Sequence, residues 1–506
     1  MDFKKKDMKK IKYLFIVSLA LLLTNCEDAV EIVQDGRLTE DKAYVNVTDL
    51  RAGLLGVYID YDLTPEIAMG AYTDEVAVGW AGGGQGRDSS LAFILDNTSD
   101  AALAFWAQGY RELFSTNVLI KAALRITPSA ADQVAYNDIL GQLYALRAFS
   151  HFQLLSYYST NYADNSALAV PIIDYVPGTD TKPLRNTNGE VYTAINADLT
   201  KAEGLLAATN LPTFVTKDFV TALKARMAAY RQDYTSAATF AQQLLAKYPI
   251  ATRAQYTNMY LDTDNTEVIF KLDRADADRY DRQGNTGSVF AGGGPGYIYA
   301  FTNPTLGGGA YFEFSRNLFN LFSPSDIRYN VSVAATSVVS PNYQTAVDYV
   351  LEDRLIVAKY KGITGALLCN DLKVFRSSEM LLILAESYAD AGNFNGATNS
   401  TASLIKRLRD ARFGTAQALP NYATKAEAFA AILNERRVEF AFEGHRYKDL
   451  KRLGVRANQG VTRDPRDCAF NGACTLTPDS YKFTLPIPLA ELNANPGLRA
   501  QQNPGY

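Results

Sequence analysis

Carboxylates are the most prominent candidates for chemistry in this sequence. Glu435, Glu439 and Glu443 recur at intervals of four residues, which places them along one side of a helix. Two carboxyl groups that face each other can serve as the acid and the base of a glycoside hydrolase. That chemistry needs one carboxyl group with a raised pKa, whereas arginines surround these three glutamates. We therefore expect ionised, paired carboxylates in a structural ion network.

The arginines of this network can be proposed from the sequence as well. Arg436, Arg437 and Arg446 lie close to the glutamates along the chain. Arg147 and Arg376 each stand alone in an apolar helical stretch and are further candidate partners. A surface hydrolase remains the alternative interpretation, but neither a catalytic histidine nor an isolated pair of acids in a loop supports it.

Histidine is scarce, which limits other kinds of chemistry. His151 and His445 are the two histidines, and they lie far apart in the sequence. Sites that hold a metal ion with several histidines are therefore not expected. His151 lies within an apolar helical stretch, so we expect an interior histidine with hydrogen-bonded ring nitrogens. We predict no cofactor and no metal site.

The cysteines suit an oxidising compartment. Cys468 and Cys474 bracket the segment Ala-Phe-Asn-Gly-Ala, which is typical of a turn. A disulfide that closes this turn is expected, and an unlinked pair of thiols is the alternative. Cys369 is expected to be buried as a small apolar residue.

The N-terminal segment has the pattern of an export signal. Six lysines in the first twelve residues precede the apolar run Tyr13–Leu23, which is shorter than the about 20 residues of a membrane-spanning helix. This pattern predicts a secretory signal peptide. The sequence Leu-Thr-Asn-Cys that ends at Cys26 resembles the lipobox of bacterial lipoproteins, although Asn25 replaces the usual small residue. An ordinary signal peptide with a chance cysteine is the alternative. Glu27 and Asp28 are similar to the acidic signal that sends lipoproteins of Bacteroidetes-type bacteria to the cell surface.

The composition predicts a globular, acidic protein. The chain has 506 residues, of which 47% are hydrophobic and 21% are charged. Removal of residues 1–25 takes away six Lys and two Asp, so the formal net charge changes from −4 to −8. Such a chain lacks the basic surface that binding to nucleic acid requires. No later apolar stretch has the length of a membrane-spanning helix, so the lipid on Cys26 is the expected anchor.

The spacing of apolar residues predicts a mostly helical chain. Between residues 131 and 158, two apolar stripes recur with helical spacing, which indicates a helix packed between neighbours on both sides. Trp106 lies in another helical stretch, with Tyr110 and Leu113, and is expected in the core. Between residues 256 and 359 the helical spacing fails, and glycine-rich loops are expected instead.

An internal repeat supports a helical scaffold. Residues 225–245 are similar to residues 385–405, at an offset of 160. Each copy is predicted to form a helix, a tight turn (231–233 or 391–393) and a second helix. Alanines where the helices cross and an aromatic residue after the turn are typical of tetratricopeptide repeats. Chance alignment of alanine-rich helices is the alternative.

Five segments together resemble the SusD/RagB family of surface lipoproteins that bind glycans. Their order, the chain length and the lipobox all agree with that family, and the resemblance covers nearly the whole chain after the signal peptide. The segments are Phe105-Trp106-Ala107-Gln108-Gly109-Tyr110 running to Asn117, Leu143–Phe152, Phe375–Tyr388, Asn434–Leu450, and Leu485-Pro486-Ile487-Pro488 with the closing Gln502–Tyr506.

The resemblance implies a mostly α fold, in which a tetratricopeptide-like helical scaffold carries long loops. It places one SusD-like domain at residues 26–506, after a lipoprotein signal peptide at residues 1–25. Within that domain we expect a helical scaffold at about 40–255 and 370–460, a loop-rich ligand-binding insertion at about 256–369, and a C-terminal loop region at 461–506.

The resemblance also implies a function. It predicts a non-catalytic lipoprotein of the outer membrane that faces the cell surface, binds an oligo- or polysaccharide and delivers it to a SusC-like TonB-dependent transporter. A RagB-like protein that captures peptides or proteins is the alternative within the same family. A hydrolase and a purely structural scaffold are the alternatives outside it.

The candidate ligand site combines aromatic residues with polar neighbours. A sugar ring has an apolar face and a polar rim, so it is bound by an aromatic side chain flanked by hydrogen-bonding groups. Trp80 and Arg87 border a glycine run and fit this requirement, and other aromatic residues follow a second glycine run. Aromatic side chains that only fix their loops to the body are the alternative. The candidate binding residues are Trp80, Arg87, Asp74, Tyr297, Tyr299 and Phe301.

Overall fold

The structure is a computed structural model of the chain. It describes residues 40–79, 90–274, 294–299, 312–347, 349–363, 366–367 and 369–506. Cys26, Trp80, Arg87 and Phe301 therefore lie outside the described residues, as does the side chain of Tyr297.

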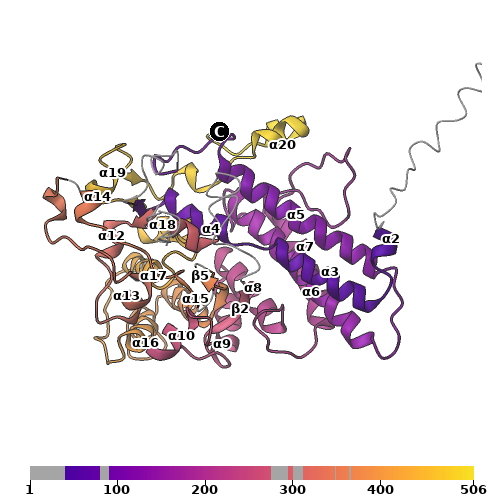
Figure 1. The fold of residues 1–506 in the computed structure, drawn as a ribbon, viewed down its shortest axis with the longest axis horizontal. Helices are drawn as coiled ribbons and strands as arrows, with labels where there is room; N and C mark the ends of the chain where they lie inside the picture. The colour runs from indigo at the N-terminus through magenta and orange to yellow at the C-terminus, as the bar shows by residue number, and fades with distance from the viewer. Residues whose placement is uncertain are drawn as a thin grey trace, which may run out of the picture.

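Long helices form the body of the protein, which confirms the expected mostly α fold. In Figure 1, helices α3, α5, α6 and α7 lie together on one side, and helices α12 to α19 lie on the other. The long helices are α3 (Val47–Asp60), α5 (Asp100–Ala123), α6 (Gln133–Tyr158), α7 (Asn188–Leu205), α8 (Lys217–Tyr230), α9 (Tyr234–Leu245), α15 (Ser377–Asp390), α16 (Thr401–Phe413), α17 (Lys425–Glu439) and α18 (Arg446–Ala457).

The helix predicted from two apolar stripes is α6. It packs against α5 on one side and α7 on the other, and almost every side chain from Ile139 to Tyr158 is buried. Its neighbour α7 begins at a capping box, in which Thr187 accepts a hydrogen bond from the backbone of Glu190 and the Glu190 side chain accepts one in return. The prediction of a helix enclosed between neighbours is confirmed.

The first copy of the predicted repeat has the expected form, and the second does not. Helices α8 and α9 are separated by the three-residue turn 231–233. The second copy needs residues 391–400 to connect α15 to α16, so the expected tight turn at 391–393 followed directly by a helix is wrong. Gly396 has φ +128°, which a helix does not allow, and Ser400 caps the start of α16 instead.

Strands are short and occur in pairs. The described residues contain four antiparallel two-stranded sheets. They are β1 (Val76–Val78) with β3 (Phe312–Phe314), β2 (Val268–Leu272) with β6 (Leu372–Arg376), β4 (Gly362–Ile363) with β5 (Ala366–Leu367), and β7 (Val461–Thr462) with β8 (Thr475–Leu476).

Short helices connect these elements. They are α2 (Glu40–Ala43), α4 (Thr64–Ala68), η1 (Met69–Tyr72), α10 (Arg253–Met259), α11 (Pro295–Tyr299), α12 (Arg316–Phe319), α13 (Ile327–Ser332), η4 (Tyr343–Thr345), α14 (Tyr349–Glu352), α19 (Pro465–Cys468), η5 (Tyr481–Phe483), α20 (Leu489–Ala494) and η6 (Pro496–Gln501). Among the described helices, none combines the length and the apolar character that crossing a membrane requires.

Trp106 and His151 lie in the core, as predicted. Trp106 is 5% exposed and its ring contacts Tyr158 edge-on at 5.0 Å between centroids. The backbone N–H of Ile173 donates to His151 Nε2 at 3.1 Å, which leaves Nδ1 to donate to the carbonyl of Arg147 at 3.0 Å. Burial lowers the pKa of His151 to about 4, so the ring is neutral at pH 7.

The predicted ion network exists and is buried. Arg376 Nη1 lies 2.9 Å from Glu439 Oε1, and Arg376 Nη2 lies 2.9 Å from Glu443 Oε1. Arg412 Nη2 is 2.7 Å from the same oxygen of Glu439, and Arg328 Nη1 is 2.7 Å from Glu435 Oε1. The structural interpretation of these carboxylates is therefore confirmed.

The partners proposed for the other arginines were wrong. Arg436 pairs with Asp449 rather than with the three glutamates, because neighbouring positions on a helix point in different directions. Arg437 and Arg446 pair with Asp74. Arg147 pairs with Asp198, which α7 supplies, at 2.7 Å.

The cysteines in the described part of the chain are placed as follows. Cys468 and Cys474 are joined by a disulfide, with their Cα atoms 5.2 Å apart. Cys369 is buried, with 5% of its surface exposed.

Candidate functional site

Two of the predicted ligand-binding segments connect to the body at one strand pair. Val78, at the end of β1, is the register partner of Phe312, at the start of β3. The chain leaves the described residues after Gly79, toward Trp80 and Arg87, and re-enters them at Phe312, after Phe301. The attachment points of these two segments therefore lie next to each other.

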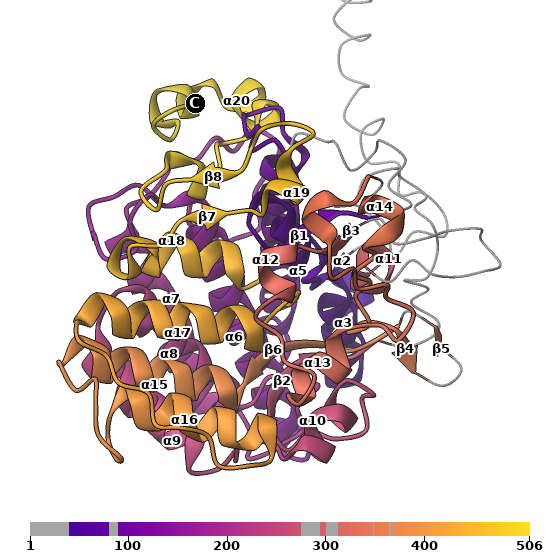
Figure 2. The ribbon, with the colours of Figure 1, turned by 90° about the vertical axis from the view of Figure 1, so that its left-hand side faces the viewer.

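Helix α11, which contains Tyr297 and Tyr299, is fixed to the same region. It packs against α4 and β3. The Tyr299 hydroxyl donates to the carbonyl of Ile67 in α4 at 2.5 Å, and its ring lies 5.1 Å from that of Phe442. We call the unit formed by α4, η1, β1, β3 and α11 the loop platform. Figure 2 shows β1, β3 and α11 together on one side of the molecule.

A third attachment point lies beside α4. Arg274 is the last described residue before the segment 275–293. Its Nη2 donates to the carbonyl of Tyr61 at 2.9 Å, and its backbone N–H donates to Asp371 Oδ1 at 2.9 Å. These contacts hold the start of that segment close to the residues that precede α4.

Asp74 anchors the loop platform to the helical body. It is 2% exposed, and its two carboxylate oxygens accept hydrogen bonds from Arg446 Nε and Nη2 at 2.8 and 2.9 Å. Burial opposes ionisation of this carboxyl group, but the charges of Arg437 and Arg446 outweigh that effect and lower its pKa to about 2. Asp74 is therefore a paired, buried anion.

Glu75, which the sequence interpretation did not single out, lies at the centre of the platform. Its Oε1 accepts a hydrogen bond from the backbone N–H of Phe442 at 2.8 Å, while its Oε2 has no partner among the described residues. Burial raises the pKa of Glu75 to about 7. A Cβ atom on Gly70 would lie 2.6 Å from Glu75 Oε2 and 3.0 Å from the Tyr299 hydroxyl, so a larger residue there would displace the Glu75 carboxyl group. No local sequence pattern announces this close packing.

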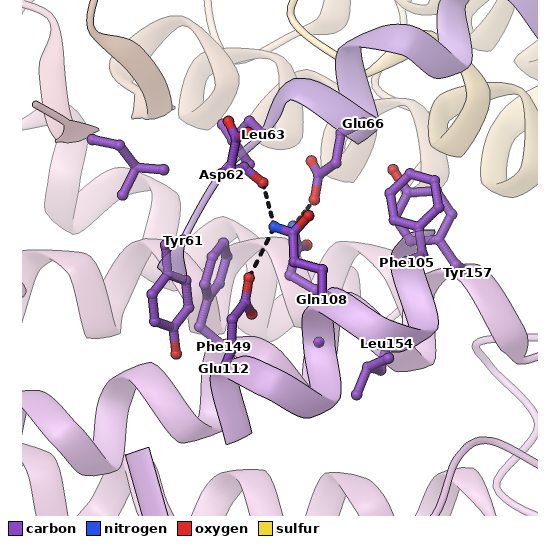
Figure 3. Close-up of a pocket in the computed structure, with 13 residues that line it drawn as sticks. Tyr61, Asp62, Leu63, Glu66, Phe105, Gln108, Glu112, Phe149, Leu154 and Tyr157 are labelled. Atoms are coloured by element: carbon purple, nitrogen blue, oxygen red, sulfur yellow. Dashed lines mark hydrogen bonds between the residues drawn. The ribbon is translucent and has the colours of Figure 1, made fainter. Parts of the chain in front are cut away.

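A small cavity lies behind the platform, between α4, α5 and α6 (Figure 3). Gln108 Nε2 donates to the carbonyl of Asp62 at 2.6 Å and to Glu112 Oε1 at 3.0 Å. Burial, together with the nearby carboxyl groups of Glu66 and Asp60, raises the pKa of Glu112 to about 8. The cavity measures about 30 Å³, which suits water and is far below the roughly 300–1,000 Å³ of ligand pockets.

Two parts of this chain match families of known proteins. Residues 328–506 match the family described as the SusD family, and residues 83–230 match the family described as "Starch-binding associating with outer membrane". The chain belongs to the SusD/RagB family. SusD-like protein P2 from Formosa agariphila is 26% identical over 549 residues, which cover 99% of this chain and 100% of that protein.

Solved structures agree with this SusD-family fold. A SusD superfamily protein from Bacteroides thetaiotaomicron superposes with a TM-score of 0.74 at 20% identity, covering 91% of this chain and 100% of that one. Surface glycan-binding protein A from Bacteroides fluxus superposes with a TM-score of 0.67 at 22% identity, covering 91% and 100%. At these identities the likeness concerns the fold.

The structure of this SusD-family protein brings together two of the predicted site residues, but it buries both side chains. Asp74 and Tyr299 both belong to the loop platform, where they are 2% and 1% exposed. Neither side chain offers a surface to a ligand in this structure. Trp80, Arg87 and Phe301, and the side chain of Tyr297, lie outside the described residues. The described residues contain no group of three or more His, Cys, Asp or Glu arranged to hold a metal ion.

Proposed function

We propose that this SusD-family protein is a non-catalytic surface lipoprotein, which binds a glycan on the segments attached to its loop platform and delivers it to a SusC-like TonB-dependent transporter. One observation carries the proposal. The segments that contain Trp80, Arg87 and Phe301 connect to one strand pair, at Val78 and Phe312.

The platform supports this role because it is held firmly. Asp74 pairs with Arg446, and Tyr299 is hydrogen-bonded to α4. Binding residues attached to a rigid base lose less conformational entropy when a ligand binds, so more of the contact energy appears as affinity. In this proposal Trp80, Arg87, Tyr297 and Phe301 contact the sugar, while Asp74 and Tyr299 position the segments.

The placement of the carboxylates supports a non-catalytic role. Glu439 is fully buried, and its carboxylate is paired with Arg376 and Arg412. Glu112 has the raised pKa of a general acid, but it faces a cavity of about 30 Å³ that no sugar residue can enter. Among the described residues, the unusual carboxylates are therefore explained by packing rather than by substrate chemistry.

Anchoring and transport are the finer parts of the proposal. A lipid on Cys26 would hold the protein at the outer membrane, in agreement with the association with that membrane in the description of one matching family. Transfer of the glycan to a transporter rests on the resemblance to the SusD/RagB family as a whole.

The proposal is tested by presenting the mature protein with a glycan array and with a peptide library in parallel. Binding to one class of glycan, with no release of shorter sugars from it over time, is the expected result. Binding to peptides alone would instead identify a RagB-like protein. Cleavage of the bound glycan would identify a hydrolase.

A further inference from the structure

A second surface hollow lies outside the loop platform. It has a volume of about 700 Å³ and is bordered by α13, by residues 333–339 and by residues 356–361. We call it the outer groove. The residues that matter for its chemistry are Tyr329, Asn330, Thr336, Val339, Ile356 and Lys361. A volume of this size lies within the range of ligand-binding pockets.

Backbone hydrogen bonds fix the two walls of the outer groove. The N–H of Ala334 donates to the carbonyl of Ile356 at 2.9 Å, and the N–H of Ala358 donates to the carbonyl of Ser332 at 2.7 Å. The N–H of Val333 donates to the carbonyl of Tyr329 at 2.8 Å, which ties the first wall to α13. The groove is therefore preformed.

Among the polar side chains that line the groove, Ser337 is used inside the protein, where its hydroxyl accepts a hydrogen bond from the N–H of Ile356 at 3.0 Å. The other four have no partner of this kind: within the described residues, no hydrogen bond or ion pair involves the side-chain polar atoms of Asn330, Thr336 or Lys361, or the hydroxyl of Tyr329. Asn330 and Lys361 are exposed, and Tyr329 is half-buried with its ring against Phe319. Donors and acceptors that converge on one hollow without internal partners are available to a ligand.

Apart from Ser337, the remaining lining of the groove is apolar. Val333 and Ile356 are buried beneath it, whereas Val339 is 42% exposed. No acidic residue is among the described residues that border the groove. An apolar surface with hydroxyl, amide and ammonium groups around it matches the apolar face and the polar rim of a sugar unit.

The outer groove adjoins the loop platform. The N–H of Phe314 in β3 donates to the carbonyl of Leu355 at 2.9 Å, and the N–H of Leu355 donates to Glu313 Oε2 at 2.7 Å. The next residue, Ile356, already borders the groove. Figure 2 shows β3, α12 and α13 on the same side of the molecule as β1 and α11.

We propose that the outer groove is a second subsite, which binds further sugar units of the glycan whose other units are bound by the segments attached to the loop platform. This inference rests on the proposed glycan-binding function. Tyr329 supplies an aromatic surface, while Asn330, Thr336 and Lys361 supply hydrogen bonds to sugar hydroxyl groups. The walls of the groove are hydrogen-bonded to each other, and β3 of the platform is hydrogen-bonded to Leu355, next to the groove residue Ile356. In this proposal the groove extends binding along the glycan and favours long glycans over short ones.

The test compares wild type with the triple variant Asn330→Ala, Thr336→Val, Lys361→Ala. Lys182→Ala, an exposed lysine in another part of the surface, is the matched control. Amylopectin, polygalacturonate, xylan and laminarin are screened first by affinity electrophoresis. The trisaccharide and longer oligosaccharides of the retained polymer are then titrated calorimetrically.

The outcomes separate the groove from the main site. We expect wild type and the Lys182→Ala control to bind longer oligosaccharides about tenfold more tightly than the trisaccharide, and the triple variant to lose most of that gain. Equal affinities of the triple variant and wild type for the longer oligosaccharides would overturn the groove proposal and leave the proposed function intact. Retention of none of the four polymers, together with binding to peptides, would overturn both.

Hydrogen exchange gives an independent measurement on the unmodified protein. Longer oligosaccharides should slow amide exchange in residues 329–339 of wild type, whereas the trisaccharide should not. Unchanged exchange in this segment with a saturating long oligosaccharide would also reject the groove, whatever the stability of the triple variant.

Discussion

Arg376 Nη1 and Glu439 Oε1 lie 2.9 Å apart, with side chains that are 2% and 0% exposed. Glu439 also receives Arg412, and Arg376 also reaches Glu443 and Glu267. This pair therefore joins α17, through buried charges, to β6, to α16 and to Glu267, the residue just before β2. Such a network is costly to break because each remaining charge loses its partner in a place that water does not reach.

Glu439→Gln tests this network. The substitution keeps the shape of the side chain but leaves the guanidinium groups of Arg376 and Arg412 without a full counter-charge, so the free energy of unfolding should fall by about 3–5 kcal/mol. Thermal and urea unfolding measure the loss. Glycan affinity of the folded variant should stay at the wild-type value.

A matched control is Asp410→Asn. Asp410 pairs with Lys406 on the surface of α16, where a salt bridge contributes about 0–1 kcal/mol. If Glu439→Gln bound no glycan yet unfolded like wild type, these carboxylates would belong to the ligand site instead of the scaffold.

Glu112→Gln tests the buried carboxyl group at the small cavity. Burial raises its pKa from the ordinary 4.5 to about 8, so the folded state holds this proton more tightly than the unfolded state. The stability that this group contributes is fully present below pH 4.5 and is lost as the pH rises toward 8. Glutamine resembles the protonated form, so the variant should lose this pH dependence.

The measurement is urea unfolding at pH 5 and at pH 9. Wild type should lose about 3–5 kcal/mol more than Glu112→Gln between these two values. Glu75 and Asp467, with pKa values raised by burial to about 7 and about 6, change stability in the same direction, so some dependence of stability on pH remains in the variant.

Glu427→Gln, at an exposed glutamate, is the control. Parallel stability curves for wild type and Glu112→Gln would show that Glu112 is ionised in the folded protein.

The helical scaffold was predictable because its signals are local. The two apolar stripes of residues 131–158 required a helix with neighbours on both sides, and α6 has them. The predicted second copy of the repeat is wrong because the backbone of Gly396 is not helical and Ser400 caps the start of α16. The second helix therefore begins later than the alignment with the first copy predicts.

The site was predictable only in part, because its support is assembled from distant segments. Asp74 is paired with Arg446, 372 residues away in the sequence, and Tyr299 is hydrogen-bonded to Ile67, 232 residues away. Neither contact has a local pattern, so both residues were assigned to a ligand surface by their nearness to glycine runs. Glu75 was missed for the same reason.

Cys26→Ala tests the anchor. The proposed function assigns the lipid to this cysteine, so the variant should move from the membrane fraction to the soluble fraction when cells are fractionated. Wild type, and the variant Cys369→Ser at a buried cysteine, should stay with the membrane. Membrane retention of Cys26→Ala in cells without the transporter would contradict the lipoprotein assignment.

Trp80→Ala tests the ligand site itself. If a sugar ring stacks on this indole, its loss should weaken glycan binding by about 1–3 kcal/mol, because the apolar face of the sugar loses its platform. Tyr297→Ala should cost less affinity, since Tyr297 belongs to a second wall that shares the contact, and Arg87→Ala should change the preference among sugars more than the total affinity.

Tyr299→Phe is the structural comparison: it removes the hydrogen bond to Ile67 and should lower the free energy of unfolding by about 0.5–1.5 kcal/mol. Calorimetric titration with the glycan found on the array, together with thermal unfolding of each variant, separates the two effects. Wild-type affinity in Trp80→Ala would place the ligand elsewhere, and the segments attached to the loop platform would then be tested as contacts for the transporter.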